Sequence, residues 1–232
     1  MLQAKLKIMS DGPLQPALVE IAKTFHRESG ACAELVFGTS PIIRAKVARG
    51  EVADVLIIQP NFIAELVGFG RVVPGEHPVI ARVGLGLMVR SDAPVADVST
   101  LDSFKAAILN AESLTFNDVA SGNYFAELLQ RLGIDESVKK KIVRVESAMV
   151  FERIKQGNRN DIGVATIPLI NATNGLRLIG PLPAELQSYI NYSAALMTSA
   201  TSPQAGSGFI SFLASPAAKV ALAKTGIEAV PW

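Results

Sequence analysis

Strand and helix signals alternate along this chain, and that alternation limits the fold more than any other feature. Residues 5–9 have strand character, and residues 14–28 then carry apolar side chains at helical spacing until Gly30 ends the pattern. The alternation continues with a strand, a helix, a strand and a helix at 33–37, 41–48, 54–58 and 61–69. Because consecutive strand–helix–strand units place their strands parallel with right-handed crossovers, the pattern predicts a doubly wound parallel sheet.

The alternation breaks after residue 80 and resumes at residue 101. Two extended stretches, 80–90 and 189–198, are each long enough to carry the chain from one lobe to another. Between and after them the sequence predicts further elements at 101–110, 114–117, 122–132, 142–145, 148–156, 162–166, 168–172, 204–213 and 216–224. We expect an α/β protein with two doubly wound α/β lobes joined by a two-strand hinge. Lobe 1 is expected at 1–82 plus 193–232, and lobe 2 at 83–192.

Composition excludes several function classes. With 232 residues, 49% of them hydrophobic, the chain is long enough for one large core or two modest ones. The net charge is +1 and basic residues cluster only at 139–141, so no nucleic-acid partner is expected. No apolar stretch approaches the roughly 18–20 residues that span a bilayer, so no membrane insertion is expected. The single cysteine, Cys32, excludes an internal disulfide, and no metal-ligand cluster is present, so we expect no metal and no cofactor.

Three predicted helices begin with small polar residues directly after a strand, at 9–14, 38–41 and 119–124. A helix N-terminus offers free backbone N–H groups and the positive end of the helix dipole, and therefore holds an anion without a formal positive charge. Each turn alone is typical of ordinary N-capping. However, ligands of open α/β sheets bind outside the carboxyl ends of strands, and these turns come from both lobes. We therefore expect a small anionic ligand in the cleft between the lobes.

The chain resembles type II periplasmic solute-binding proteins, and specifically their molybdate-binding branch, over nearly its whole length. The strongest run is 37–54, in which Gly38-Thr39-Ser40-Pro41 opens a helix and a Gly-x-x-Ala-Asp turn at 50–54 leads into a strand. Supporting matches lie at 121–126, 132–133, 162–164 and 209–216. The resemblance implies the periplasmic-binding-protein type II fold, closure around a ligand and an ABC-transporter permease as partner. We expect a monomer, periplasmic if a signal peptide has been removed ahead of Met1 and cytoplasmic otherwise.

The resemblance also implies ligand-binding positions. The family holds a tetrahedral oxyanion with two hydroxyls from lobe 1, backbone N–H groups and a tyrosine hydroxyl from lobe 2. The two hydroxyl positions fall on Pro13 and Ser40, the tyrosine position on Thr166, and the backbone donors near Ser121 and Ala148. An oxyanion left without a hydrogen-bond donor loses about 1–3 kcal/mol. The altered positions therefore favour a larger ligand, such as a small di- or tricarboxylate, over a compact oxyanion.

Further donors surround these positions, and we expect Gly12, Thr39, Gly122 and Asn123 to line the same site. Arg44 follows Ser40 by four residues and lies on the same helix face. Its guanidinium either binds a ligand carboxylate in a bidentate way or belongs to the solvated helix surface, alone or in an ion pair.

Catalysis has fewer candidates. His26 is expected to be structural, His77 has no nearby nucleophile, and the chain contains no Gly-x-Ser-x-Gly elbow and no phosphate-binding P-loop. Asp11 and Glu146 adjoin the expected anion site and would act as bases if burial raised their pKa values, with helix capping as the alternative role. Tyr124 is a third candidate base.

Three functions remain open at this point. We favour solute binding. Aconitate isomerases also resemble these binding proteins, and a 1,3-proton shift on a bound tricarboxylate needs only anion binding and one base. A cytoplasmic ligand-sensing domain is the third reading.

Overall fold

The computed structural model describes residues 5–232, and the chain divides into two compact units. Unit 1 is Met1–Arg82 with Asn191–Trp232, and unit 2 is Val83–Ile190. The chain passes between the units within two strands, β4 (Val79–Arg90) and β9 (Tyr189–Leu196). The predicted fold class is confirmed: both units are α/β, and two strands connect them.

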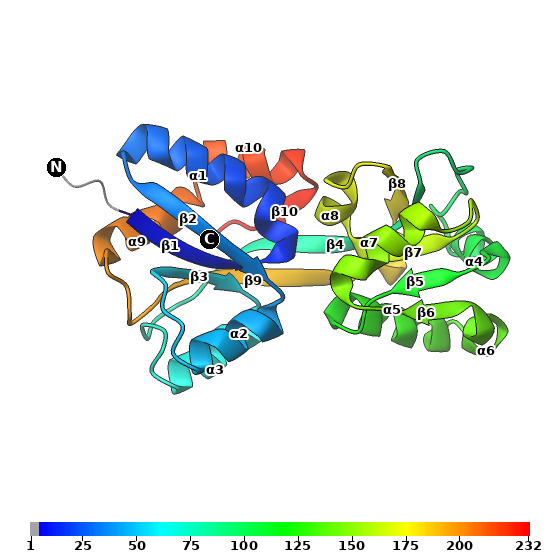
Figure 1. The fold of residues 1–232 in the computed structure, drawn as a ribbon, viewed down its shortest axis with the longest axis horizontal. Coiled ribbons are helices and arrows are strands. Elements are labelled where there is room, and N and C mark those ends of the chain that lie inside the picture. Colours follow the sequence, from blue (N-terminus) through cyan, green and yellow to red (C-terminus); the bar gives the residue numbers. More distant parts are fainter. Residues whose placement is uncertain (1–4) are drawn as a thin grey trace. The chain divides into compact units, whose positions relative to one another are not determined.

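Unit 1 is a sheet with helices on both faces. Its strands follow the order β2 (Cys32–Gly38), β1 (Lys5–Asp11), β3 (Val55–Ile58) and β9. Strand β1 is parallel to β2 and β3, and β9 is antiparallel to β3. The helical elements and the short last strand are η1 (Gly12–Leu14), α1 (Gln15–Ser29), α2 (Ser40–Ala48), α3 (Pro60–Gly68), α9 (Pro203–Phe212), α10 (Pro216–Lys224) and β10 (Ile227–Ala229). Figure 1 shows α1 and α10 on one face of this sheet and α2 and α3 on the other.

The buried side chains of unit 1 explain this layering. All four residues of β3 are buried, as expected for a parallel strand that is covered on both faces. Met9 and Leu56 pack against Ile43 of α2 and Ile63 of α3. Helix α1 ends at Gly30, whose φ of 76° is a left-handed conformation that glycine adopts without a steric penalty.

Unit 2 has a mixed sheet. Strand β4 is antiparallel to β7 (Ile162–Thr166) and to β8 (Leu176–Pro181), whereas β5 (Leu114–Phe116) is parallel to β7 and to β6 (Ile142–Arg144). Its helical elements are α4 (Leu101–Asn110), α5 (Ala120–Arg131), α6 (Asp135–Val138), η2 (Lys139–Lys141), α7 (Ser147–Gln156), α8 (Ile167–Asn171) and η3 (Ala184–Leu186). Phe125 of α5 packs edge-on against Phe116 and Phe104, with ring centroids 5.2 and 6.5 Å apart.

The sequence pattern missed α6, β8 and β10. These elements are short or, in β8, largely half-buried, so they have no clear apolar period. One shifted boundary affects the site: the helix predicted from residue 122 begins at Ala120, which places Ser121, Gly122 and Asn123 within the first turn of α5.

Within residues 5–232, none of the helices is by itself long and apolar enough to cross a membrane. Helices α9 and α10 meet the length and composition criteria only when taken together, as a pair bent by 64°.

Candidate functional site

The parallel strands of unit 1 end at one edge of the sheet. Asp11 at the end of β1 pairs in register with Gly38 at the end of β2, and Ser10 pairs with Ile57 of β3. Strand β9, which comes from unit 2, enters the sheet of unit 1 at the same edge, because its Ser193 pairs with Ile58. This edge is where an open α/β sheet binds its ligand.

The side chain of Asp11, the last residue of β1, lies at the N-terminus of α2. One carboxylate oxygen, Oδ2, accepts hydrogen bonds from the Ser40 backbone N–H, at 3.2 Å, and from the Ser40 hydroxyl. The other oxygen, Oδ1, accepts the Gly12 backbone N–H at 2.8 Å and thereby caps η1. Asp11 is only 5% exposed. The donors that the sequence analysis assigned to an external anion are therefore bound to a carboxylate of the protein itself.

The environment of Asp11 perturbs its ionisation. Burial raises the pKa of Asp11 above the ordinary value of 3.8, because removing the carboxylate from water disfavours its charged form. Hydrogen bonds from Ser40, Gly12 and Gln59 act in the opposite direction and offset part of this rise in pKa. Asp11 thus performs the capping role that the sequence left open for it, and its pKa is shifted in the direction that a general base needs.

Two residues of β9 at this edge were missed by sequence reasoning. Tyr192 is 1% exposed, and burial, together with the charge of Asp11, raises the pKa of its hydroxyl well above 10. The neighbouring Ser193 is fully buried, and its hydroxyl has no hydrogen-bond partner among the described residues. Neither residue follows a strand–helix turn, so no local pattern marks them.

The remaining predicted residues of unit 1 differ in how they are used. Pro13 lies inside η1, and Thr39 is the N-cap of α2 but makes no side-chain capping hydrogen bond. Arg44 forms a bidentate ion pair with Glu65 of α3, in which Nε lies 2.9 Å from Oε2 and Nη2 contacts Oε1. A ligand carboxylate would therefore have to compete with Glu65 for the Arg44 guanidinium.

Unit 2 has a corresponding edge, at which Phe116, Arg144 and Thr166 end the parallel strands β5, β6 and β7. Asn117, directly after β5, caps α5. Its Oδ1 accepts the backbone N–H groups of Val119 and Gly122, at 3.3 and 3.0 Å, and the Ser121 hydroxyl at 3.1 Å. Here too, donors predicted to bind an anion are bound to an acceptor of the protein.

Glycine is required at position 122 by this arrangement. A Cβ atom there would lie 1.9 Å from the Asn117 carbonyl oxygen, well inside van der Waals contact. Gly122 therefore belongs to the packing of the α5 N-terminus against Asn117, in addition to its predicted place in the site.

Asn123 and Tyr124 follow in α5. The Asn123 amide donates to the Asp118 carbonyl at 3.2 Å, and its Oδ1 accepts a hydrogen bond from Arg144. The Tyr124 hydroxyl donates to the Leu186 carbonyl at 2.8 Å, which engages the proton that a catalytic role would need.

Arg144, in unit 2, is another residue that sequence reasoning missed. It is the exposed last residue of β6, and its guanidinium carbon lies 5.3 Å from the centroid of the Phe116 ring. Its Nη2 donates to the Asn117 carbonyl at 3.2 Å as well as to Asn123. A single arginine at the end of a short strand has no motif around it, so only the structure reveals its neighbours.

At the N-termini of α7 and α8, the N-cap side chain accepts no hydrogen bond from the backbone N–H groups of the first turn. Glu146 is the N-cap of α7 but makes no side-chain capping hydrogen bond, so the predicted capping role is not seen for it. Ala148 lies exposed in the first turn of this helix. Thr166, the N-cap of α8, is 4% exposed, and within the described part of the chain its hydroxyl has no partner.

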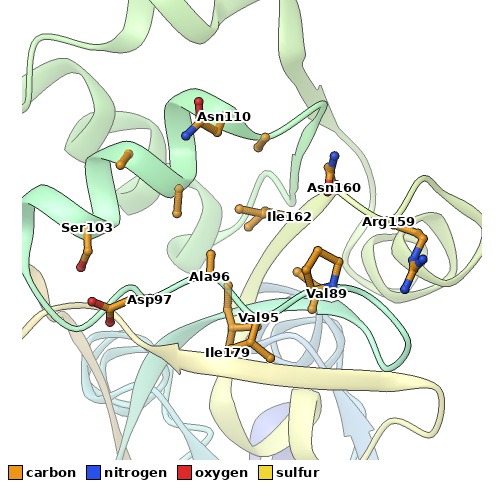
Figure 2. A pocket seen from close by; sticks show the side chains of 14 residues that line it. Val89, Val95, Ala96, Asp97, Ser103, Asn110, Arg159, Asn160, Ile162 and Ile179 are labelled. Atoms are coloured by element: carbon orange, nitrogen blue, oxygen red, sulfur yellow. The ribbon is translucent and has the colours of Figure 1, made fainter.

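A hollow of about 390 Å³ lies elsewhere in unit 2, and Figure 2 shows its lining. It includes Val89 of β4 and Ile162, the first residue of β7, and therefore sits at the opposite end of that strand from Thr166. Two of its polar side chains are bound to other groups of the protein: Arg159 donates to the Asp92 carbonyl, and Asn160 donates to Glu112 at 3.1 Å. No predicted site residue lines it, so we assign it no ligand.

Residues 5–232 contain no group of three or more histidine, cysteine, aspartate or glutamate side chains that would hold a metal ion. In unit 1 the structure brings together Asp11, Gly12 and Ser40. In unit 2 it brings together Ser121, Gly122 and Asn123 around Asn117 and Arg144.

Comparison with known proteins places this architecture in a family. The model of the bacterial extracellular solute-binding protein family matches residues 6–228. The chain therefore belongs to the bacterial extracellular solute-binding proteins.

Individual relatives are more distant. An aconitate isomerase from Pseudomonas sp. is 27% identical over 97% of this chain and 88% of its own length. The molybdate-binding protein ModA of Escherichia coli K12 is 21% identical over 84% of this chain and 78% of its own length. Among solved structures, the periplasmic molybdate-binding protein of Azotobacter vinelandii superposes with a TM-score of 0.81 at 18% identity, over 98% of this chain and 100% of its own. That last likeness is one of fold.

Proposed function

We propose that this protein binds a small organic polycarboxylate at the carboxyl ends of the strands of both units. The observation that carries the proposal is that the Asp11 carboxylate accepts hydrogen bonds from the backbone N–H and the hydroxyl of Ser40. A doubly charged inorganic oxyanion would have to displace that carboxylate and remain beside it, and like charges repel strongly where water is excluded. An organic acid avoids this conflict, because it can present a C–H or hydroxyl group to Asp11 and place its carboxylates elsewhere.

Donors for those carboxylates are available in unit 2. The backbone amides at the start of α7, near Ala148, lack a side-chain cap, and the buried Thr166 hydroxyl lacks a partner in the described structure. Free helix N-termini and buried hydroxyls suit an anion. The relative that is an aconitate isomerase supports a tricarboxylate, and the molybdate-binding relative supports an anion in general.

We further propose that the ligand contacts both units and stabilises a closed arrangement, since only contacts that differ between two states shift their balance. Membership of an extracellular solute-binding family supports a location outside the cytoplasmic membrane and delivery of the ligand to an ABC-transporter permease.

Isothermal titration calorimetry tests the ligand class. Protein that has been unfolded and refolded, to remove any acid carried through purification, is titrated with cis-aconitate, trans-aconitate, citrate, molybdate and sulfate. We expect at least one polycarboxylate to bind at least tenfold more tightly than molybdate. Tight molybdate binding, or heats of binding from none of the organic acids, contradicts the proposal.

The buried Asp11 also favours a second candidate function, isomerisation of the bound acid. The ionised carboxylate would accept a proton from a methylene carbon next to the ligand's double bond, and the electron pair of that C–H bond would form a new double bond. The original double bond would then take a proton at its far carbon, returned from Asp11. This 1,3-shift conserves protons and electrons and requires no cofactor.

Proton NMR in D₂O tests this second function. An isomerase exchanges the ligand's methylene protons for deuterium and interconverts cis- and trans-aconitate, and Asp11→Asn would abolish both processes while leaving an intact fold. If the wild-type protein binds aconitate without exchange or conversion at high protein concentration, the protein is a binding protein only.

A further inference from the structure

Arg144 lies at the edge of the unit 2 sheet where β5, β6 and β7 end, which we call the ligand edge because the proposed ligand binds there. As the last residue of β6 it pairs in register with Phe116, the last residue of β5. The helices that follow these two strands, α5 and α7, both begin directly after them. Arg90, by contrast, lies at the other end of the sheet, because it is Leu85 in β4 that pairs with Thr166.

One side of the Arg144 guanidinium is held in place. Nη2 donates to the Asn117 carbonyl at 3.2 Å and to the Asn123 side chain, and the group lies over the ring of Phe116. Phe116 is fully buried and Asn117 is 6% exposed, so two of these three contacts belong to the interior of the unit. A guanidinium fixed in this way loses less side-chain entropy when it binds a planar acid.

The other side of the same guanidinium has no partner in the described structure. Among residues 5–232, nothing accepts a hydrogen bond from Nε or Nη1 of Arg144, whose bonds all come from Nη2, and no acidic side chain lies within ion-pairing distance of the guanidinium. Arg44 and Arg90 show what this chain does with guanidinium groups that serve its own structure. Each of them is bound in a bidentate way, Arg44 to Glu65 and Arg90 to Asp92.

A second unsatisfied group lies on the same edge. Strand β7, which neighbours β5, ends at Thr166, whose buried hydroxyl lacks a partner within the described residues. Side chains alternate along a strand, so Thr166 shares its face with Val164, which packs in the same cluster as Phe125 of α5. The α5 side of this edge thus combines a held cation with a buried hydroxyl that lacks an acceptor.

We infer that Arg144 is the residue that recognises a carboxylate of the ligand, by a bidentate contact from Nε and Nη1, and so selects organic acids. This inference rests on the proposed binding of a polycarboxylate and names the residue that makes the selection. Arginine matches a planar carboxylate with two parallel N–H donors, a geometry that lysine cannot reproduce.

Calorimetry on three variants tests the inference. Arg144→Gln removes both the charge and the two parallel N–H donors, whereas Arg144→Lys retains the charge alone. Arg153→Gln is the control, because it makes the same charge change in the last turn of α7, away from the ligand edge. Each is titrated with the tightest-binding acid found for the wild-type protein. Loss of a charge-assisted bidentate contact is expected to weaken binding by Arg144→Gln about tenfold to a hundredfold, with Arg144→Lys intermediate and Arg153→Gln unchanged.

A second measurement separates recognition from a structural role. Thermal unfolding of the unliganded variants is compared with the wild-type protein, because loss of the contact with Phe116 alone would lower stability without changing ligand preference. We expect Arg144→Gln to reduce the advantage of the acid over its monoamide. If the wild type binds an acid and Arg144→Gln binds it equally well with the same preference, the inference fails although the proposed function stands. If the wild type binds no organic acid, the proposed function fails and the inference fails with it.

Discussion

The N-termini of α2 and α5 solve the same problem with different chemistry. Both helices begin just beyond the carboxyl end of a parallel strand, and in both a side chain of the protein accepts hydrogen bonds from the free donors: Asp11 at α2 and Asn117 at α5. The acceptor at α5 is a neutral amide, whereas that at α2 is a buried carboxylate with a raised pKa. Both acceptors satisfy the donors of a helix start, but only Asp11 can carry a charge or a proton, and the proposed function depends on that difference.

Replacing a glycine at each helix start is expected to give the largest difference in stability between the two regions. In Gly122→Ala the new Cβ would meet the Asn117 carbonyl oxygen at 1.9 Å, so the start of α5 must shift. We expect a loss of about 1–3 kcal/mol or more in the free energy of unfolding. Gly12→Ala is the matched variant at the other edge, where the new Cβ lies 3.9 Å from the Gly38 carbonyl oxygen. Urea denaturation should show little change for Gly12→Ala, and equal losses for both variants would contradict this packing account.

Serine substitutions compare the two acceptors directly. Ser40→Ala removes a hydrogen bond to a buried carboxylate and should cost about 1.5–3 kcal/mol, whereas Ser121→Ala removes one to a neutral amide and should cost about 0.5–1.5 kcal/mol. Ser40→Ala should also raise the pKa of Asp11 further, since the Ser40 hydrogen bond lowers it. Denaturation of both variants at pH 7 gives the two values, and the reverse order would show that the charge of Asp11 does not matter for stability.

The pH dependence of stability isolates the Asp11 carboxyl. Because its pKa is raised on folding, the native state holds this proton more tightly than the unfolded chain does. The resulting stabilisation is fully present below pH 3.8 and is lost as the pH rises through the raised native pKa. Its size is about 1.4 kcal/mol for each unit of pKa rise. Asp11→Asn lacks this contribution, so its stability relative to the wild type should increase with pH; a constant difference from pH 4 to 8 would rule out a raised pKa.

Arg44 is expected to show the smallest effect. Its ion pair with Glu65 joins two side chains that are each 34% exposed, and such pairs contribute up to about 1 kcal/mol. A double-mutant cycle with Arg44→Gln and Glu65→Gln measures this coupling. If Arg44→Gln instead weakens ligand binding more than Arg144→Gln does, then unit 1 supplies the carboxylate contact and the inference about Arg144 has the wrong unit.

Sequence reasoning reached the fold because strands and helices alternate with clear apolar periods. It also placed Asp11 beside the end of a strand, and Ser40 and Ser121 beside the start of the helix that follows one. It did not foresee that Asp11 would bind Ser40, because the two residues are 29 positions apart and meet only through the pairing of β1 with β2. Asn117 caps residues only four and five positions further along the chain, but the sequence pattern did not distinguish it from an ordinary loop residue.

Tyr192, Ser193 and Arg144 were missed for a different reason. Their roles come from strand neighbours: Ser193 lies beside Ile58, and Arg144 beside Phe116. Register across a sheet is set by tertiary packing, which a pattern read along one segment does not contain.

The proposed function depends on Asp11: we propose that its carboxylate, bound at the start of α2, keeps inorganic oxyanions out and leaves the site to organic acids. Calorimetric titration of the wild type and of Asp11→Asn with molybdate tests it most directly. We expect no measurable molybdate binding by the wild type and a gain of binding by Asp11→Asn, in which the repelling charge is gone. Tight molybdate binding by the wild type, or an affinity that the substitution leaves unchanged, would contradict it.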